Sequence, residues 1–155
     1  EVSEPEIVVF IDGDFSDYPE EIESLVKPIV ENRADFVLGS RMIFPESRAA
    51  LLPQARYGNL LAVFLIRLFF RYKFTDLGPF RAIRYQSLKE ISMTDKNFGW
   101  TVEMQIKAVK HGLKIMEIPV HYRKRIGVSK ITGTISGTFK AGIKIIFTIF
   151  KYLLI

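Results

Sequence analysis

The sequence contains no cysteine and only two histidines, His111 and His121, which stand ten residues apart. The absence of cysteine excludes disulfide bonds, thiolate zinc sites and a cysteine nucleophile. The two histidines do not have the spacing of a metal-ligand pair, and nothing in the sequence supports a catalytic triad. The chemistry of this chain therefore rests on carboxylates, hydroxyls and basic side chains.

Charge is divided along the chain. Residues 1–35 carry eleven acidic and two basic side chains, whereas residues 105–155 carry ten basic side chains and one acidic side chain. A basic end of this kind favours an anionic partner such as phosphate, nucleic acid or an anionic membrane, and mutual neutralisation within the fold is the alternative. With 155 residues, 48% of them hydrophobic, one domain with a sizeable core is expected.

The most informative local pattern is Asp12-Gly13-Asp14, directly after the apolar run from Ile7 to Ile11. Such a run predicts a buried strand, and ligands of open α/β sheets bind at the carboxyl ends of their strands. Two carboxylates, with a glycine that lets the backbone turn, suit a divalent cation that carries substrate phosphates. Alone, the triplet is equally typical of a turn.

Hydrophobic periodicity and breakers predict the other elements. We expect helices over residues 17–30, 54–70, 85–91, 100–111 and most of 131–155, and strands over 34–38, within 75–84 and over 114–120. Residues 42–55 are expected to form a loop, and Asp17 is expected to cap the first helix. Alternating strands and helices predict an α/β sandwich with a mainly parallel sheet.

The order of motifs resembles family 2 inverting glycosyltransferases of the GT-A fold, and within them the dolichyl-phosphate mannosyltransferase-like enzymes. The resemblance spans residues 6–150 and rests on IDGDFSDYPEEI, VLGSR, RYGNLLA, TDLGPFRAIR, FGWTVEMQIKA and GLKIMEIPVHYRKRIGVSK. It implies a three-layer α/β sandwich, nucleotide-diphospho-sugar transferase-like, that is the C-terminal part of a catalytic domain. The N-terminal half would then be missing, and the isolated fragment is expected to be inactive.

The resemblance also implies a function. We expect transfer of a hexose from a nucleotide-diphosphate sugar to a polyprenyl (dolichyl-type) phosphate or related lipid, at the cytoplasmic face of a membrane, with peripheral attachment and no role for nucleic acid. Residues 1–130 would form the acceptor-side part of the domain. Two alternatives stay open: transfer to a sugar or glycerolipid hydroxyl with Glu103 as base, and a non-catalytic membrane-binding module on the same fold.

Donor residues follow from the same resemblance. Asp12 and Asp14, with Ser16 as a weaker ligand, would hold Mg²⁺ or Mn²⁺ against the donor diphosphate, which makes Asp14 a catalytic candidate; Ser16 as a helix cap is the alternative. Asp76 would accept hydrogen bonds from the donor sugar, or else form a turn. Arg125, Ser129 and Lys130 would close as a loop over the pyrophosphate or acceptor phosphate, with a solvated charge run as the alternative.

Two further arginines suit an anionic acceptor. The resemblance implies that Arg41 and Arg56 contact the acceptor phosphate, together with Ser129, because guanidinium groups match phosphate oxygens. Each arginine could instead pair with a surface acid such as Asp35 or Glu46.

Glu103 lies in an otherwise apolar helical face, where an unpaired carboxylate is costly. It is therefore either a catalytic general base or an ion-pair partner, with Arg81 or an arginine of the basic loop as the expected cation. A phosphate acceptor needs no base, whereas a hydroxyl acceptor does.

The pattern of residues 131–155 predicts an amphipathic helix. Lys140, Lys144 and Lys151 fall on one stripe beside a wide apolar face, which is typical of a helix lying in a membrane interface. A purely packing role is the alternative.

Overall fold

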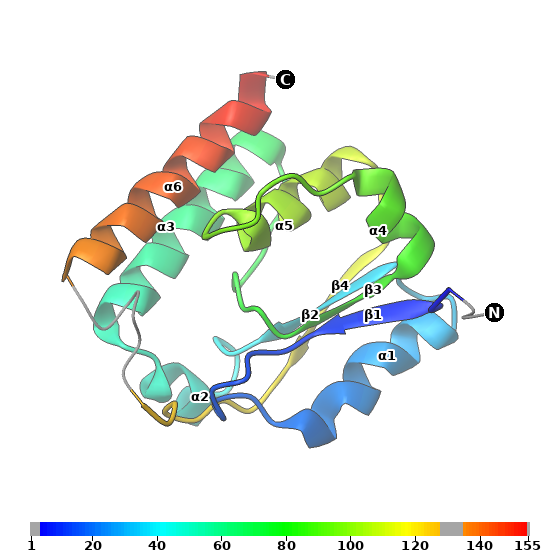
Figure 1. Cartoon of the computed structure of the whole chain (residues 1–155), viewed down its shortest axis with the longest axis horizontal. Coiled ribbons are helices and arrows are strands. Elements are labelled where there is room, and N and C mark those ends of the chain that lie inside the picture. Colours follow the sequence, from blue (N-terminus) through cyan, green and yellow to red (C-terminus); the bar gives the residue numbers. More distant parts are fainter. Residues whose placement is uncertain (1–3, 128–134, 155) are drawn as a thin grey trace.

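The computed structural model describes residues 4–127 and 135–154 and is built on a four-stranded sheet (Figure 1). In spatial order the strands are β1 (Ile7–Phe10), β3 (Arg81–Arg84), β2 (Phe36–Ser40) and β4 (Ile115–Pro119). β2 pairs parallel with β4, whereas β3 pairs antiparallel with both β1 and β2. The expected α/β class is confirmed, but the sheet is mixed rather than mainly parallel, because the reversed strand lies between two strands that share a direction.

β3 runs opposite to β1 and β2 because the chain enters it at the edge of the sheet where those two strands end. Its first residue, Arg81, lies opposite Phe10, the last residue of β1, and opposite Leu38 of β2. The chain therefore enters β3 at the edge where β1 and β2 finish. As a result, the loop before β3 meets the segments that follow the other strands at one edge of the sheet.

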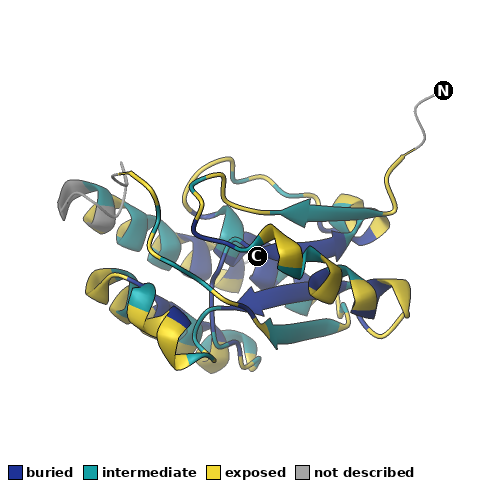
Figure 2. Ribbon diagram, turned by 90° about the horizontal axis from the view of Figure 1, so that it is seen from below, coloured by how far each residue is buried: buried dark blue, intermediate teal, exposed yellow. Residues whose placement is uncertain are grey.

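Helices cover both faces of the sheet, which gives the expected three layers (Figure 1). On one face lies α1 (Ile22–Val30), whose Leu25 and Ile29 pack with Val37 and Ala82 of the sheet. The other face supports the larger core, in which α3 (Pro53–Phe70), α5 (Trp100–Lys110) and α6 (Ile135–Leu154) take part. Figure 2 shows the central strand β2 buried between these layers, while the outer strands β1 and β4 are of intermediate burial.

The remaining helices are short. A 3-10 turn, η1 (Pro19–Glu21), precedes α1, and α4 (Tyr85–Ile91) follows β3. Residues 42–55, expected to form a loop, contain the short helix α2 (Pro45–Ala50). Pro45 lies in the first turn of α2, where the missing amide hydrogen is tolerated. The expected cap at Asp17 is wrong: Tyr18 and Glu21 precede η1 and α1 without a side-chain cap.

Helices α3 and α6 form an outer layer with an unusual surface. Each turns one side to the core, through Ala62 and Ile66 on α3 and through Ile149 and Tyr152 on α6. The opposite sides expose large apolar side chains, namely Tyr57, Leu60, Leu61, Phe64, Leu68, Phe139, Ile143, Phe147, Phe150 and Leu154. We call these residues the outer apolar face. Within the part of the chain that the structure describes, no helix has the length and apolarity needed to cross a membrane.

Candidate active site

Four segments meet at the edge of the sheet where β1, β2 and β4 end and β3 begins. They are the turn over residues 11–17, the residues after β2, the loop over residues 75–80 and the segment over residues 120–127. Backbone hydrogen bonds hold them together, from Gly39 to Phe80 (2.9 Å) and from Val120 to Ser40 (3.1 Å). Because ligands of α/β sheets bind at this kind of edge, it is the candidate active site.

The turn after β1 is shaped around Asp14. One carboxylate oxygen of Asp14, Oδ1, accepts hydrogen bonds from the backbone and the hydroxyl of Ser16, at 3.0 and 2.5 Å. Ser16 is therefore not a helix cap but a buried support for Asp14. The left-handed residue of the turn is Phe15, with a φ of 68°, and a Cβ added to Gly13 would meet nothing within 4 Å. The turn therefore does not depend on the conformational freedom of Gly13.

Three carboxylates crowd this turn. Desolvation and the nearby charge of Asp14 raise the pKa of Asp12. Partial burial acts in the same direction on Asp14, but the hydrogen bonds from Ser16 and the charge of Arg125 outweigh it and lower the pKa of Asp14. Beneath them lies Asp17, which is only 2% exposed and whose pKa burial raises to about 6. Its Oδ2 accepts a hydrogen bond from the backbone of Asp12 at 3.3 Å.

Asp17 was missed as a site residue by sequence reasoning. Its place beside Pro19 at the start of an acidic helix made capping the natural expectation. The Oδ1 atom of Asp17 is buried and has no hydrogen-bond partner among the described residues. Asp17 is therefore a third carboxylate of this turn, and one of its oxygens is left without a hydrogen-bond partner among the described residues.

The basic segment after β4 runs alongside the turn. Tyr122 forms a β-bridge with Asp17, and the backbone amides of Arg123 and Ile126 donate to the carbonyls of Ser16 and Asp14, each at 3.0 Å. The guanidinium of Arg123 lies 3.6 Å from the ring centroid of Phe15. The structure therefore places residues 122–126 of the basic loop beside the Asp-Gly-Asp turn.

Arg125 makes the direct charge contact of that segment. Its Nη2 pairs with Oδ2 of Asp14, so the predicted donor residues Asp14 and Arg125 do lie together. Ser129 and Lys130, the other residues expected on this loop, lie outside the described residues.

Arg41 and Asp76 hold each other. Nε and Nη2 of Arg41 donate to the two carboxylate oxygens of Asp76 at 2.8 and 2.9 Å, and the backbone amide of Arg41 adds a third bond at 2.9 Å. Burial alone would raise the pKa of Asp76, but the charge and hydrogen bonds of Arg41 lower it. The guanidinium also lies 5.1 Å from the ring centroid of Tyr122. Asp76 therefore orients Arg41, and its predicted contact with the donor sugar stays a prediction.

Side chains from three elements fix the loop that carries Asp76. Asn59 of α3 donates to the carbonyl of Thr75 (3.1 Å) and accepts from the amide of Leu77 (2.8 Å). Glu117 of β4 accepts from the amide of Thr75 at 2.9 Å, and Gln105 of α5 donates to the carbonyl of Asp76 at 2.9 Å. The loop is thus preorganised, and its position depends on residues far from it in sequence.

Glu103 is an internal anchor. Its carboxylate is fully buried and accepts hydrogen bonds from the amides of Thr94 (2.9 Å) and Asp95 (2.6 Å) and from the hydroxyl of Tyr152 (2.7 Å), and it pairs with Lys107 at 2.8 Å. Desolvation opposes ionisation, but these partners lower its pKa to about 2. Both oxygens are occupied, which supports the pairing alternative rather than the general base.

The partner expected for Glu103 was wrong. Arg81 is fully buried and donates instead to backbone carbonyls, among them that of Thr101 at 3.0 Å, while its guanidinium lies 4.9 Å from the ring centroid of Trp100. The nearer cation is Lys107, one helical turn from Glu103.

Arg56 lies half-buried in the first turns of α3 and takes part in none of the ion pairs formed among the described residues. The acids named as alternative partners are engaged elsewhere: Asp35 pairs with Arg84 at 3.7 Å, and Glu46 lies 3.9 Å from His121. Arg56 stays a prediction as an acceptor contact.

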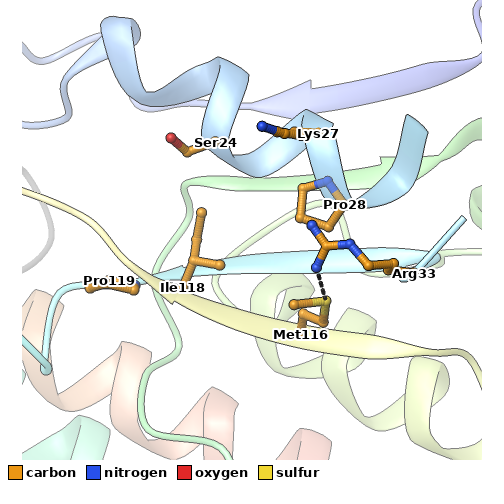
Figure 3. Close-up of a pocket in the computed structure, with 7 residues that line it drawn as sticks. All are labelled: Ser24, Lys27, Pro28, Arg33, Met116, Ile118 and Pro119. Carbon is orange, nitrogen blue, oxygen red and sulfur yellow. Dashed lines mark hydrogen bonds between the residues drawn. The ribbon is translucent and has the colours of Figure 1, made fainter. Parts of the chain in front are cut away.

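A separate pocket lies between α1 and the edge strand β4 (Figure 3). Lys27 and Arg33 flank an apolar floor that includes Met116 and Ile118, and Nη1 of Arg33 lies 3.9 Å from the sulfur of Met116. None of the predicted site residues lines it.

The chain is similar in sequence to several known proteins. The chain is 31% identical over 137 residues to an uncharacterized protein of Methanocaldococcus jannaschii, covering 83% of this chain and 56% of that protein. It is 30% identical over 138 residues to an undecaprenyl-phosphate mannosyltransferase of Micrococcus luteus, covering 85% and 56%. It is 30% identical over 118 residues to a UDP-N-acetylglucosamine–dolichyl-phosphate N-acetylglucosaminyltransferase of Methanococcus voltae, covering 74% and 47%. The chain thus spans about half the length of these relatives.

The family comparison covers the acidic half of the site. The sequence model described as Glycosyl transferase family 2 matches residues 1–92, which is more than half of the chain and includes the Asp-Gly-Asp turn, Arg41 and Asp76. Together with the relatives, this match assigns the molecule: the chain belongs to glycosyl transferase family 2.

Proposed function

We propose that the full-length protein transfers a hexose from a nucleotide-diphosphate sugar to a polyprenyl phosphate or related lipid phosphate, with inversion at the anomeric carbon. The observation that carries this proposal is the convergence of carboxylates and arginines at one edge of the sheet: Asp12, Asp14, Arg41 and Arg125. Two relatives named for transfer to undecaprenyl phosphate and dolichyl phosphate support a lipid-phosphate acceptor.

The donor side of the site fits a divalent cation. Asp12 and Asp14 supply the oxygen ligands that Mg²⁺ and Mn²⁺ prefer, and they are close enough for their charges to interact. Among the described residues no three acidic or histidine side chains are placed to share one ion, so diphosphate oxygens and water would complete the shell. When bound, such a cation stabilises the negative charge that develops on the leaving nucleoside diphosphate.

On the acceptor side of the proposed site, Asp76 holds the guanidinium of Arg41 in a fixed orientation. Because Asp76 engages Nε and Nη2 of Arg41, the remaining nitrogen, Nη1, is the donor available to an acceptor phosphate. An acceptor oxygen would attack the anomeric carbon from the side opposite the diphosphate; the new C–O bond forms as the old one breaks, and the diphosphate leaves with the electron pair. A phosphate is already ionised near neutral pH, so this displacement needs no general base.

The alternative acceptor, a hydroxyl, would require such a base. Glu103 is enclosed by Thr94, Lys107 and Tyr152 and is held ionised by them, so it is not positioned to take a proton from a substrate. We expect Glu103→Gln, assayed where it is folded, to keep transfer to a lipid phosphate within about threefold of wild type. Complete loss of transfer by a folded variant would favour the hydroxyl acceptor.

The outer apolar face suits a membrane surface. Neither α3 nor α6 contains an acidic residue, and basic side chains such as Arg67, Lys140 and Lys151 lie on the same two helices. Lys144 does not take part, because it pairs with Asp95 at 2.9 Å. A large apolar surface on two helices whose own charged side chains are all basic favours anionic lipid over a second copy, whose like charges would repel.

The direct test is transfer of a radiolabelled sugar to polyprenyl phosphate by the full-length protein, with and without Mn²⁺. We expect Asp14→Ala to lower the rate by at least a hundredfold, and chelation of the metal to have a similar effect. Arg48→Ala, on the surface of α2, serves as a charge-changing control. Undiminished transfer by Asp14→Ala would exclude the metal role.

A further inference from the structure

We propose that Arg125 and the divalent cation are alternative partners of Asp14, so that Arg125 occupies the cation's place until metal and donor arrive and then turns to the donor diphosphate. This inference rests on the proposed function and assigns to Arg125 a role that the function alone does not require. It concerns the order of events at the site rather than the chemistry of transfer.

Both oxygens of Asp14 are engaged. Ser16 holds Oδ1 through its amide and hydroxyl, and Arg125 pairs with Oδ2. An ion bound by Asp14 through Oδ2 would meet the positive charge of the guanidinium at that oxygen, so the two cations compete there. Asp12, by contrast, makes no side-chain ion pair with the described residues, so the contest between the two cations centres on Asp14.

The rest of the segment has contacts of its own. The amide of Ile126 donates to the carbonyl of Asp14, and the amide of Arg123 donates to the carbonyl of Ser16, both at 3.0 Å. Arg123 adds a hydrogen bond to the carbonyl of Phe15 at 2.6 Å and lies 4.4 Å from the ring centroid of Tyr18. None of these contacts uses the side chain of Arg125. Its guanidinium can therefore leave Asp14 while the backbone of the segment stays beside the turn.

Binding of the cation and the diphosphate would move the Arg125 guanidinium from Asp14 toward the diphosphate. An incoming cation repels the guanidinium of Arg125, and the diphosphate that accompanies the cation offers it oxygen acceptors that suit its fork of donors. Mn²⁺ alone must then compete with Arg125, whereas Mn²⁺ with a diphosphate gives Arg125 a new partner. By thermodynamic linkage, cation and diphosphate should bind with positive cooperativity that depends on Arg125.

The test measures Mn²⁺ binding rather than turnover. Full-length wild type, Arg125→Gln, Arg125→Lys and Lys124→Gln are titrated with Mn²⁺, and free Mn²⁺ is followed by electron paramagnetic resonance, alone and with UDP or GDP. We expect Arg125→Gln to bind Mn²⁺ alone roughly fivefold more tightly than wild type, because a partly exposed ion pair no longer competes. Lys124→Gln removes the same charge from the neighbouring position and should change the affinity by less than about twofold.

Two further readouts make the result decisive. The nucleoside diphosphate should tighten Mn²⁺ binding more in wild type than in Arg125→Gln, and Arg125→Lys should lie between them. Equal Mn²⁺ affinity of wild type and a folded Arg125→Gln, in a protein that does bind Mn²⁺ with diphosphate, overturns this inference alone. If wild type binds no Mn²⁺ with either diphosphate, the metal role in the proposed function fails and the inference fails with it.

Discussion

Arg41 and Asp76 stand thirty-five residues apart in sequence, yet they form a two-pronged ion pair in which Asp76 is fully enclosed and the side chain of Arg41 is 14% exposed. The resemblance assigned one residue to the acceptor and the other to the donor sugar. Their pairing links the two halves of the site, because the group that would meet the acceptor phosphate is aimed by a carboxylate on the loop before β3.

Breaking this pair should destabilise the protein. Asp76→Asn removes the charge but not the size of the side chain, and it leaves Arg41 largely buried without a counter-ion. We expect a loss of about 2–4 kcal/mol in the free energy of unfolding, measured by urea titration. Asp35→Asn is the matched control, since its partner Arg84 is 3.7 Å away and both side chains are partly exposed; its loss should stay below about 1 kcal/mol. Equal losses in unfolding free energy for the two variants would mean that the Arg41–Asp76 pair stabilises the fold no more than a partly exposed ion pair does.

Two glycines should respond differently to alanine. A Cβ at Gly78 would lie 3.0 Å from Oδ2 of Asp76 and 3.1 Å from Nε of Arg41, whereas a Cβ at Gly13 would meet nothing within 4 Å. Gly78→Ala should therefore cost about 1–2 kcal/mol in thermal unfolding, and Gly13→Ala should stay within about 0.5 kcal/mol of wild type. A strongly destabilised Gly13→Ala would contradict the turn geometry described above.

The sequence predicted much of this framework, for local reasons. The apolar run before Asp12 predicted a strand, although β1 is an outer strand of intermediate burial and not a buried one, and the helical spacing of Leu25 and Ile29 predicted α1. The pairing of Arg41 with Asp76 and the anchoring of Thr75 by Glu117 could not be predicted, because they join segments that only the fold brings together. The direction of β3 and the left-handed Phe15 escaped prediction for a related reason: neither has a residue signal, and tertiary contacts decide both.

Acid should weaken the anchor at Glu103. Its pKa in the folded protein, about 2, lies below its ordinary value of 4.5, so the fold favours the ionised form. This stabilisation is fully present above about pH 5 and is lost as the pH falls toward 2; it amounts to roughly 3 kcal/mol. The difference in unfolding free energy between wild type and Glu103→Gln, measured by urea titration, should therefore be largest at pH 7 and shrink steadily as the pH falls toward 2. Glu23→Gln, exposed on α1, is the control for the substitution itself; a difference between wild type and Glu103→Gln that stays constant with pH would refute the linkage.

The outer apolar face can be tested with vesicles. Phe64→Glu on α3 and Phe147→Glu on α6 each place a charge where 59% of the side chain is exposed, so they should leave the core intact. We expect each to weaken co-sedimentation with phosphatidylcholine vesicles containing phosphatidylglycerol by about tenfold. Val30→Glu, on the opposite face of the sheet and 65% exposed, is the control. Unchanged vesicle binding together with a shift in oligomeric state would assign the face to self-association instead.

Helix α3 also sets a distance. Asn59 points inward from this helix and holds the loop that carries Asp76, while Tyr57, Leu60 and Leu61 point outward from the same turns. The width of an α-helix, about 10–12 Å with its side chains, therefore separates the loop from whatever surface α3 rests on. If that surface is a bilayer, the helix acts as a fixed spacer that keeps the reacting edge at the height of the lipid headgroups, so the phosphate of a lipid acceptor need not leave the membrane to be glycosylated.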